Sequence, residues 1–232
     1  MTINHIAIIP DGNGRWATKN NVSKAEGHAK GAENAKNIVR IAAELGVKNL
    51  TLWGFSSENW RRTEEEIGEL MELMMLYLTT ELESLHENNI KFNVIGDIEK
   101  LSLEMQDAIY KAKKLTENNT ALNLYIAISY GGKDEIARAC RKIIDKSTKS
   151  SDVTEDLIQA NLDIPEMPDV DLVIRTSGEK RISNFLIWQI AYSELYFSNV
   201  LWPDFDESEF KEAIEDFHRR KRNFGYAREQ IT

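Results

Sequence analysis

Short apolar runs that alternate with longer helical segments constrain the fold of this chain more than any other feature. Runs of strand length lie at 6–9, 50–55, 90–95, 122–128, 170–174 and 195–200. Segments with helical spacing of apolar residues lie at 29–45, 64–87, 102–118, 132–147, 154–161, 183–191 and 207–222. Such alternation is typical of a parallel sheet with helices on both faces. We therefore predict an α/β fold in a single domain, with a six-stranded, mostly parallel sheet flanked by helices.

Length and charge narrow the classes of protein that fit. The 232 residues suit one domain over 1–232, with 223–232 as a C-terminal arm. A net charge of −9 argues against nucleic-acid binding, which usually needs a basic face. The lone Cys140 excludes a disulfide within the chain. Neither a leader pattern nor an apolar run of membrane-spanning length is present. We expect a cytoplasmic protein with at most peripheral membrane contact.

Polar motifs follow three of the predicted strands. The segment 11–16 (DGNGRW) follows the first strand, 56–62 (SSENWRR) the second, and 175–183 (RTSGEKRIS) the fifth. Glu194 stands at the start of the sixth. Ligands of parallel sheets bind beyond the carboxyl ends of the strands. We therefore expect these motifs to converge on one site.

The residue types in these motifs favour a polyanionic substrate. Glycines let the backbone approach a phosphate, and a helix start offers free N–H groups. Asp11 can reach a phosphate through a metal ion, and arginine matches phosphate oxygens with its planar fork. Lys24 and His28 open the first long helix and extend the set. Each motif alone could be a turn or a packing element; their co-location predicts a phosphate site with magnesium.

The motif sequences resemble the cis-prenyltransferase family. The resemblance rests on DGNGRW, EGH (26–28), FSSENW, YGG (130–132) and IRTSGEKRISNFLIWQIAYSEL followed by LWPDF, and extends from His5 to about Gly225. It is closest to the undecaprenyl diphosphate synthase branch. The resemblance implies a magnesium-dependent homodimer that condenses isopentenyl diphosphate onto an allylic diphosphate. We expect this allylic substrate to be farnesyl diphosphate. The implied product is a poly-cis polyprenyl diphosphate, by analogy undecaprenyl diphosphate for cell-wall lipid carrier synthesis.

The resemblance also assigns roles to residues. It implies that Asp11 holds magnesium and assists departure of the allylic diphosphate. Asn59 matches the position of the proton acceptor, although a neutral amide is barely basic and could orient the substrate instead. Glu194 matches a second magnesium ligand, which in the family can come from the partner subunit. The positions that match substrate-binding residues are Gly12, Asn13, Gly14, Arg15, Trp16, Lys24, His28, Ser56, Ser57, Glu58, Trp60, Arg62, Arg175, Arg181, Ile182 and Ser183.

Three positions depart from the family pattern. Lys24 stands where arginine is common, which replaces a two-pronged phosphate contact with a point charge. Pro10 stands where methionine is common and stiffens the start of the loop. The usual Arg-x-Gly near the C-terminus reads Asn223-Phe224-Gly225, which leaves open whether this arm contacts substrate or Arg222 substitutes.

A growing isoprenoid tail needs an apolar tunnel. Each five-carbon unit buried removes roughly 4 kcal/mol of unfavourable hydration. The segment 64–87 is apolar on most of its surface, so it is either a buried core helix or a helix that also lines the tunnel. Gly54, just before the FSS motif, would leave space there.

Two other functions use the same residues. A phosphohydrolase could use Asp11 as nucleophile, but such enzymes commonly carry a second aspartate two residues on, where this chain has Asn13. A non-catalytic subunit of a heteromeric prenyltransferase would characteristically lose the catalytic ligands. This chain keeps Asp11, Asn59 and Arg175, which favours the enzyme.

Overall fold

One parallel sheet organises the molecule. The computed structural model describes residues 3–221. Its strands are β1 (His5–Ile9), β2 (Asn49–Ser56), β3 (Ile90–Ile95), β4 (Leu122–Tyr130), β5 (Leu172–Arg175) and β6 (Glu194–Phe197). They form a six-stranded sheet in the order β3-β4-β2-β1-β5-β6, and every neighbouring pair is parallel. The predicted α/β class and strand count are confirmed.

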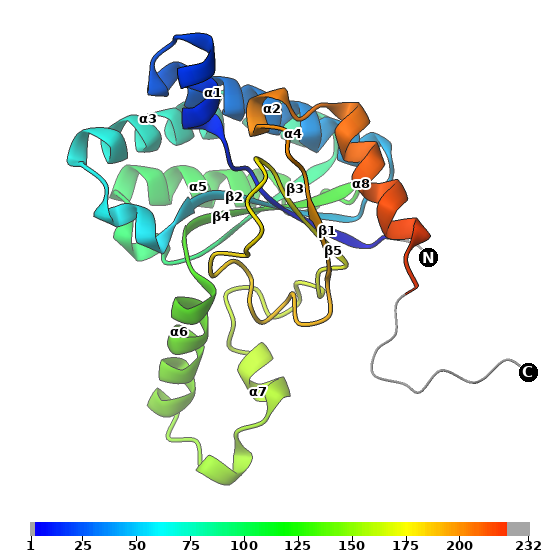
Figure 1. The fold of residues 1–232 in the computed structure, drawn as a ribbon. Helices are drawn as coiled ribbons and strands as arrows, with labels where there is room; N and C mark the ends of the chain where they lie inside the picture. Colours follow the sequence, from blue (N-terminus) through cyan, green and yellow to red (C-terminus); the bar gives the residue numbers. More distant parts are fainter. Residues whose placement is uncertain (1–2, 222–232) are drawn as a thin grey trace, which may run out of the picture.

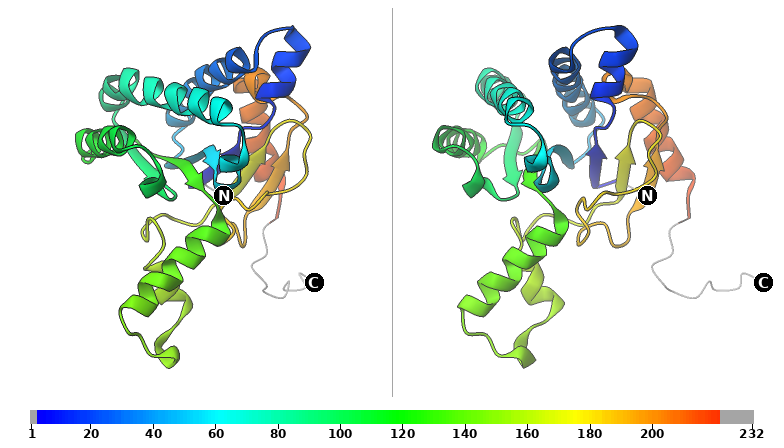
Figure 2. Two further views of the ribbon diagram at one scale, coloured as in Figure 1. Left: turned by 90° about the vertical axis from the view of Figure 1, so that its left-hand side faces the viewer. Right: turned by 60° about the vertical axis from the view of Figure 1, so that its left-hand side comes forward.

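The helices divide unequally between the two sides of the sheet. They are α1 (Asn13–Asn20), α2 (Lys24–Glu44), α3 (Glu64–Thr80), α4 (Leu82–Glu87), α5 (Leu103–Thr116), α6 (Gly132–Asp145), α7 (Glu155–Gln159) and α8 (Glu207–Arg219). Helices α2, α3, α5 and α8 cover one face, whereas α6 and α7 project from the other side (Figures 1 and 2). None of the helices within residues 3–221 has the length and apolar character that a membrane crossing requires.

The alternation of side chains along a strand separates two apolar cores. Ile6 and Ile8 of β1 pack in the larger core beneath the helices, whereas Ala7 and Ile9 pack in the smaller core on the opposite face. Both faces of the central strand are therefore buried, as its continuous apolar run predicts.

The second face of the sheet is covered largely by irregular chain. The prediction of a helix over 183–191 is wrong, because this segment forms turns. Its apolar residues Phe185, Leu186 and Ile190 are buried against the sheet, so helix-like apolar spacing here reflects packing. Leu186 has a φ of 44°, which is incompatible with a right-handed helix.

The predicted long helix over 64–87 is broken near its end. Helix α3 ends at Thr80, and α4 begins at Leu82. The Thr79 hydroxyl donates to the carbonyls of Met75 and Leu76, at 2.8 and 2.9 Å, and the Thr80 hydroxyl also donates to Leu76. Such bonds compete with the helical pattern and bend a helix.

Other predicted boundaries move by a few residues. The fifth strand begins at Leu172 and the sixth ends at Phe197, so both are shorter or shifted relative to 170–174 and 195–200. Helix α8 ends at Arg219. The predictions for 222–232, including the C-terminal arm, lie outside the described residues.

His5 is an uncharged residue of the smaller core. Its side chain is fully buried, with Nδ1 2.7 Å from the Pro168 carbonyl and Nε2 2.8 Å from the Thr51 hydroxyl. Burial lowers the pKa of His5 from 6.5 to about 4, against smaller opposing effects from nearby acceptors and Asp171. Folding therefore favours the neutral imidazole.

This burial predicts a pH-dependent stability. Because the folded-state pKa is depressed, only the unfolded chain binds a proton at His5 between pH 6.5 and about 4. The stability contribution is complete above pH 6.5 and is lost as pH falls through this window, by up to about 3 kcal/mol. Urea unfolding of the wild type and His5→Gln at pH 7 and 5 measures it. An equal pH effect in both proteins would contradict the prediction, and His86→Gln, at an exposed position, serves as control.

Candidate active site

An ion pair joins the ends of two strands at the centre of the carboxyl edge. Asp11 follows β1, and Arg175 is the last residue of β5. The Arg175 guanidinium donates to the Asp11 carboxylate at 2.8 Å. Between β1 and β5 the chain reverses its direction of travel across the sheet, which is where ligands of such sheets bind. The predicted convergence of the first and fifth motifs is thus present.

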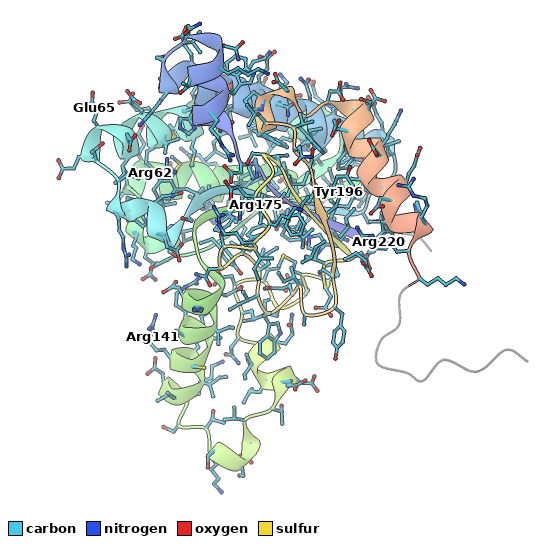
Figure 3. All side chains as sticks on the ribbon, in the orientation of Figure 1. Arg62, Glu65, Arg141, Arg175, Tyr196 and Arg220 are labelled. Atoms are coloured by element: carbon cyan, nitrogen blue, oxygen red, sulfur yellow. The ribbon has the colours of Figure 1, made fainter. Side chains whose placement is uncertain are left out.

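Arg175 is almost buried and has more than one acceptor. Its side chain is 5% exposed, and it also donates to the Arg181 carbonyl and the Ser183 hydroxyl, each at 2.7 Å. Its Nε is buried without a partner among the described residues. A buried donor of this kind costs free energy unless an acceptor reaches it, so the site is prepared for an oxygen-rich anion. Figure 3 places Arg175 near the middle of the molecule.

The backbone of Asp11 is held on two sides. The Thr176 hydroxyl accepts from the Asp11 N–H at 2.8 Å and donates to the Asp11 carbonyl at 2.6 Å. The N–H of Trp202 donates to the same carbonyl at 3.0 Å. The carboxylate therefore projects from a fixed loop.

Glycines in α2 allow α1 to lie close to it. A Cβ at Gly27 would stand 2.6 Å from the Asn13 carbonyl oxygen and 2.9 Å from Cβ of Ala17. A Cβ at Gly31 would stand 2.4 Å from Oδ1 of Asn13. The first turn of α1, which follows Asp11, is therefore positioned by the absence of two side chains.

Arg15 and Trp16 extend from α1 towards other motifs. Arg15 donates to the carbonyl and the hydroxyl of Ser177, and pairs with Asp11 at 3.3 Å. The Trp16 indole N–H donates to Asp204 at 2.7 Å. Gly12, with a φ of 120°, lies against Leu201, while Gly14 has open space around it. The DGNGRW loop is thus tied to both the RTSG and the LWPDF segments.

The turn after β2 fixes the orientation of Asn59. Ser56 and Asn59 form a capping box in which the Ser56 N–H donates to Oδ1 of Asn59 at 2.9 Å. The Asn59 N–H donates to the Ser56 hydroxyl at 3.2 Å. The amide oxygen of Asn59 is engaged by this bond, so an orienting role fits better than proton abstraction.

The rest of this turn anchors an aromatic side chain and carries an arginine. The Trp60 indole N–H donates to Ser129 at 2.9 Å, and its ring packs edge-on against Phe55 at 5.0 Å between centroids. Ser57 donates to Glu58 at 3.0 Å. Arg62 lines the same cavity as Asp11 and Arg175.

The start of α2 carries Lys24 and His28, and His28 lines the cavity. Lys24 is mostly exposed and pairs with Glu66 of α3 at 2.7 Å. Burial lowers the pKa of His28, and the charges of Arg62 and Lys24 lower it further against the opposing effect of Glu66. A neutral imidazole can accept the hydrogen bond that Asn13 Nδ2 donates to Nδ1 at 3.3 Å.

The loop after β5 places the last predicted residues. The Ser183 hydroxyl accepts from Arg175, and Ile182 is partly buried against the smaller core. The Arg181 side chain is 59% exposed and pairs with Glu179. Arg181 therefore reaches the site through its backbone carbonyl, while its guanidinium remains available to solvent and anions.

Glu194 does not join Asp11 within this chain. It stands opposite Leu172 in the β5–β6 pairing, whereas Arg175, opposite Phe197, marks the other end of the strands. Leu172 and Arg175 are three residues apart along β5, so Glu194 lies about 10 Å from the end of the strands at which Arg175 stands. Glu194 instead accepts from Arg220 at 2.8 Å, and Arg220 lies at the foot of α8, away from Arg175 (Figure 3). The expected convergence of both carboxylates fails within one chain, because residues at opposite ends of parallel strands face opposite edges.

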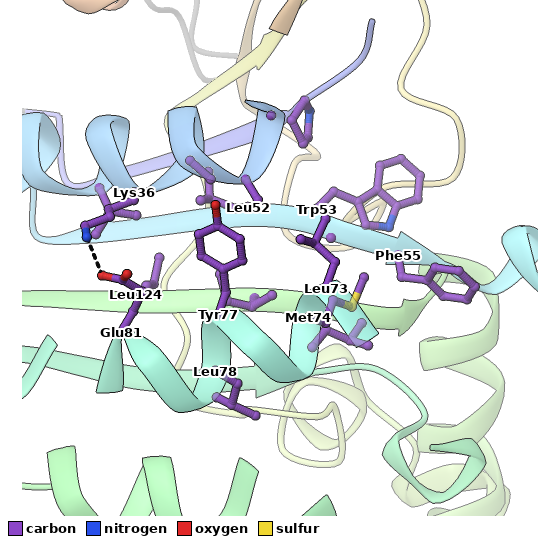
Figure 4. A pocket seen from close by; sticks show the side chains of 18 of the residues that line it. Lys36, Leu52, Trp53, Phe55, Leu73, Met74, Tyr77, Leu78, Glu81 and Leu124 are labelled. Atoms are coloured by element: carbon purple, nitrogen blue, oxygen red, sulfur yellow. Dashed lines mark ion pairs between the residues drawn. The ribbon is translucent and has the colours of Figure 1, made fainter. Parts of the chain in front are cut away.

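An apolar cavity opens from the site. It encloses about 830 Å³, and its lining includes Asp11, Arg62 and Arg175 at the carboxyl edge of the sheet. It continues past Gly54 to Ile90 at the start of β3, so it extends beneath the helices along the strands. Figure 4 shows Met74 and Tyr77 of α3 beside Leu52 and Leu124 of the sheet, with the Lys36–Glu81 ion pair further along. Helix α3 both packs on the core and lines the cavity, which combines the two roles predicted for 64–87.

Asp11 is a carboxylate of the cavity lining that could hold a metal ion. Among residues 3–221, no three His, Cys, Asp or Glu side chains gather as a metal cluster. Magnesium is usually held by one or two carboxylates together with substrate phosphates. A single carboxylate surrounded by arginines fits that arrangement.

Several positioning residues carry weak sequence signals. Thr176 holds the Asp11 backbone, and Asn34 donates to the carbonyls of Trp202 and Phe205 at 2.6 and 2.9 Å. Asp204 holds Trp16. Thr176 and Asp204 lie in the RTSG and LWPDF motifs, and Asn34 lies in α2. The partners of all three are distant in sequence and become visible only in the fold.

Comparison with known proteins decides the family. Residues 9–225 match the family described as "Putative undecaprenyl diphosphate synthase". The chain belongs to this family. The prenyltransferase is 49% identical over 225 residues to the ditrans,polycis-undecaprenyl-diphosphate synthase ((2E,6E)-farnesyl-diphosphate specific) of Photorhabdus laumondii. That match covers 95% of this chain and 89% of the relative.

Two solved structures have the same fold as the prenyltransferase. Lavandulyl diphosphate synthase from Lavandula x intermedia, in complex with dimethylallyl diphosphate, has a TM-score of 0.92 at 36% identity, covering 97% of this chain and 99% of that chain. A probable undecaprenyl diphosphate synthase from Campylobacter jejuni has a TM-score of 0.82 at 35% identity, with 97% and 100% covered. The fold and family expected from the motifs are confirmed.

The close approach of α1 to α2 predicts a stability effect. Gly27→Ala should destabilise the prenyltransferase by about 1–3 kcal/mol, because the new methyl group would meet the backbone of Asn13. Gly68→Ala in α3 is the control, since no atom beyond its chain neighbours and the nearby backbone of its own helix lies within 4 Å of its added Cβ. That change should stabilise by up to about 1 kcal/mol. Urea unfolding measures both, and equal effects at the two positions would refute the packing argument.

Proposed function

We propose that this prenyltransferase condenses isopentenyl diphosphate onto farnesyl diphosphate and makes a poly-cis polyprenyl diphosphate. The product that we propose is undecaprenyl diphosphate. The names of relatives that are 49% identical over most of the chain support this substrate and product. In this proposal the product serves as the lipid carrier of cell-wall synthesis.

The observation that carries the proposal is the union of a phosphate site with an apolar cavity. Asp11, Arg62 and Arg175 line one end of the cavity, and Leu52, Met74 and Leu124 line its interior. A polyprenyl diphosphate has the same division, with a charged head and a long apolar tail. Burial of the tail is favourable by roughly 4 kcal/mol for each five-carbon unit, which supports extension of a chain inside the cavity.

The cationic residues divide into two groups in this proposal. Gly12 to Arg15, with Lys24 and Arg62, hold the allylic diphosphate, whereas Arg175, Arg181 and Ser183 hold isopentenyl diphosphate. Asp11 would hold magnesium in this proposal, and the ion would supply stabilisation of the charge on the leaving diphosphate. Charge-assisted hydrogen bonds from the arginines add to that stabilisation.

The reaction is a condensation with loss of diphosphate. The bond between the allylic carbon and the diphosphate oxygen breaks, and its electron pair leaves with the diphosphate. The double bond of isopentenyl diphosphate forms the new carbon–carbon bond, and a proton is then lost to a diphosphate oxygen. Asn59 orients the substrate, because its own amide oxygen already accepts from Ser56. The cis geometry follows from how the two substrates are held.

We further propose that the enzyme acts as a homodimer in the cytoplasm. Glu194 lies away from Asp11 in its own chain, which fits a role at the site of a second copy as the other magnesium ligand. The long apolar product would partition into a bilayer, so transient contact with the inner membrane face accompanies its release.

Replacement of Asp11 tests the function. Asp11→Ala should lower kcat at least about a hundredfold, since it removes the carboxylate at the reacting diphosphate. The assay combines farnesyl diphosphate, labelled isopentenyl diphosphate and magnesium, and sizes the products. Asp107→Asn, at an exposed position of α5, should retain full activity. Full activity of Asp11→Ala would overturn the site. Release of phosphate without chain growth by the wild type would favour a phosphohydrolase.

Gly54 should set the room available to the tail. An added Cβ at Gly54 would lie 3.4 Å from Ile126 and 3.8 Å from Met74, inside the cavity. A leucine adds about as many carbons as one isoprene unit, so Gly54→Leu should shorten the main product by at least one unit. Chromatography of the labelled chains measures this. Gly68→Leu is the control, and unchanged lengths in Gly54→Leu would rule out the tail path.

A further inference from the structure

Asn184 lies where three loops of the site meet. Its side-chain Nδ2 donates to Glu58, in the turn after β2, at 2.9 Å. Its Oδ1 accepts from the backbone N–H of Lys133 at 2.9 Å, and its own carbonyl accepts from the N–H of Gly132 at 2.7 Å. One residue therefore joins the loop after β5, the turn after β2 and the start of α6.

The YGG motif makes this meeting possible. A Cβ at Gly131 would stand 2.4 Å from the Ser57 hydroxyl and 2.8 Å from Nδ2 of Asn184. A Cβ at Gly132 would stand 2.9 Å from the backbone nitrogen of Ile187. The two glycines thus provide space for the turn after β2 and for the loop that carries Asn184.

Asn184 is adjacent to a residue that contacts the central arginine. Ser183 accepts from Arg175 at 2.7 Å. Ser183 and Asn184 both have left-handed backbone conformations, with φ of 50° and 68°. Such conformations persist for non-glycine residues where surrounding contacts enforce them, and asparagine adopts them more readily than most residues. The bonds of Asn184 therefore also fix the position of the Ser183 hydroxyl.

We propose that Asn184 is a positioning residue that sets the separation between the isopentenyl diphosphate half of the site and the allylic half. Arg175 and Ser183 belong to the first half, and the turn of Ser56 to Arg62 belongs to the second. The bond from Asn184 to Glu58 is a direct side-chain link between the loop of the first half and the turn of the second. This inference rests on the proposed function.

The state of Glu58 supports the link. Burial raises the pKa of Glu58, but the hydrogen bonds from Asn184, Ser57 and Ser56 outweigh it and hold the pKa below its ordinary value. The carboxylate is therefore ionised near neutral pH and requires a donor opposite it. Asparagine supplies that donor, whereas an aspartate of the same shape would place a second negative charge there.

Two substitutions that together move the negative charge from residue 58 to residue 184 test the inference. Asn184→Asp keeps the side-chain shape and the acceptor for Lys133 but repels Glu58. It should lower kcat/KM for isopentenyl diphosphate about tenfold, chiefly through KM, because one charge-assisted hydrogen bond is lost. The KM for farnesyl diphosphate, whose tail lies in the cavity, should change by less than about twofold. In Asn184→Asp combined with Glu58→Gln, the glutamine amide can donate to the new carboxylate. That double variant should recover most of the loss when compared with Glu58→Gln alone.

Matched variants separate positioning from simple stability. Asn184→Gly keeps the left-handed backbone accessible and removes only the side-chain bonds, so it should show the same selective rise in KM with little change in Tm. An unchanged kcat/KM in Asn184→Asp would overturn the inference, as would equal losses for both substrates or no recovery in the double variant. If the wild type itself fails to extend farnesyl diphosphate, the proposed function fails instead.

Discussion

The contact between Arg175 and Asp11 is the interaction on which the rest of the site depends. A nearly buried guanidinium is costly unless its donors are satisfied, and here they meet the Asp11 carboxylate, the Arg181 carbonyl and the Ser183 hydroxyl. The Nε donor is buried and has no partner among the described residues. Because β1 and β5 are hydrogen-bonded neighbours, the pair lies where the sheet changes its winding direction. The fold thus holds the Arg175 guanidinium and the Asp11 carboxylate together at one end of an apolar cavity. A diphosphate that binds to Arg175 must compete with this ion pair.

The site depends on close approach between backbone segments as well as on charged side chains. Gly27 and Gly31 admit Asn13 against α2, and Gly131 admits Ser57 and Asn184 beside α6. Polar side chains then fasten each approach, as Thr176 does for Asp11 and Asn184 does for Glu58. The motifs that define the family are therefore only partly lists of substrate ligands. Many of their residues position a neighbouring loop.

The spacing of apolar residues predicted the strands and most helices well, but it failed for residues 183–191, which cover the second face of the sheet. The strands of the central sheet appear because continuous apolar runs must be buried on both faces. The helix expected over 183–191 fails because Phe185, Leu186 and Ile190 bury themselves on the sheet without helical backbone. The break at Glu81 escapes a periodicity argument because α3 and α4 keep a similar apolar stripe on either side of it. It depends on hydroxyls of Thr79 and Thr80 that compete for helical carbonyls.

The sequence by itself determined the α/β class, the family and the motif residues, since these follow from apolar periodicity and from residue types fixed in short segments. It also placed Asp11 and Arg175 at one edge, because the carboxyl ends of parallel strands lie together. Only the tertiary structure decided which partners meet across the chain: Glu58 with Asn184, Trp16 with Asp204, and Glu194 with Arg220 rather than Asp11. Such pairings depend on strand order and on the packing of loops over distances that no local pattern encodes.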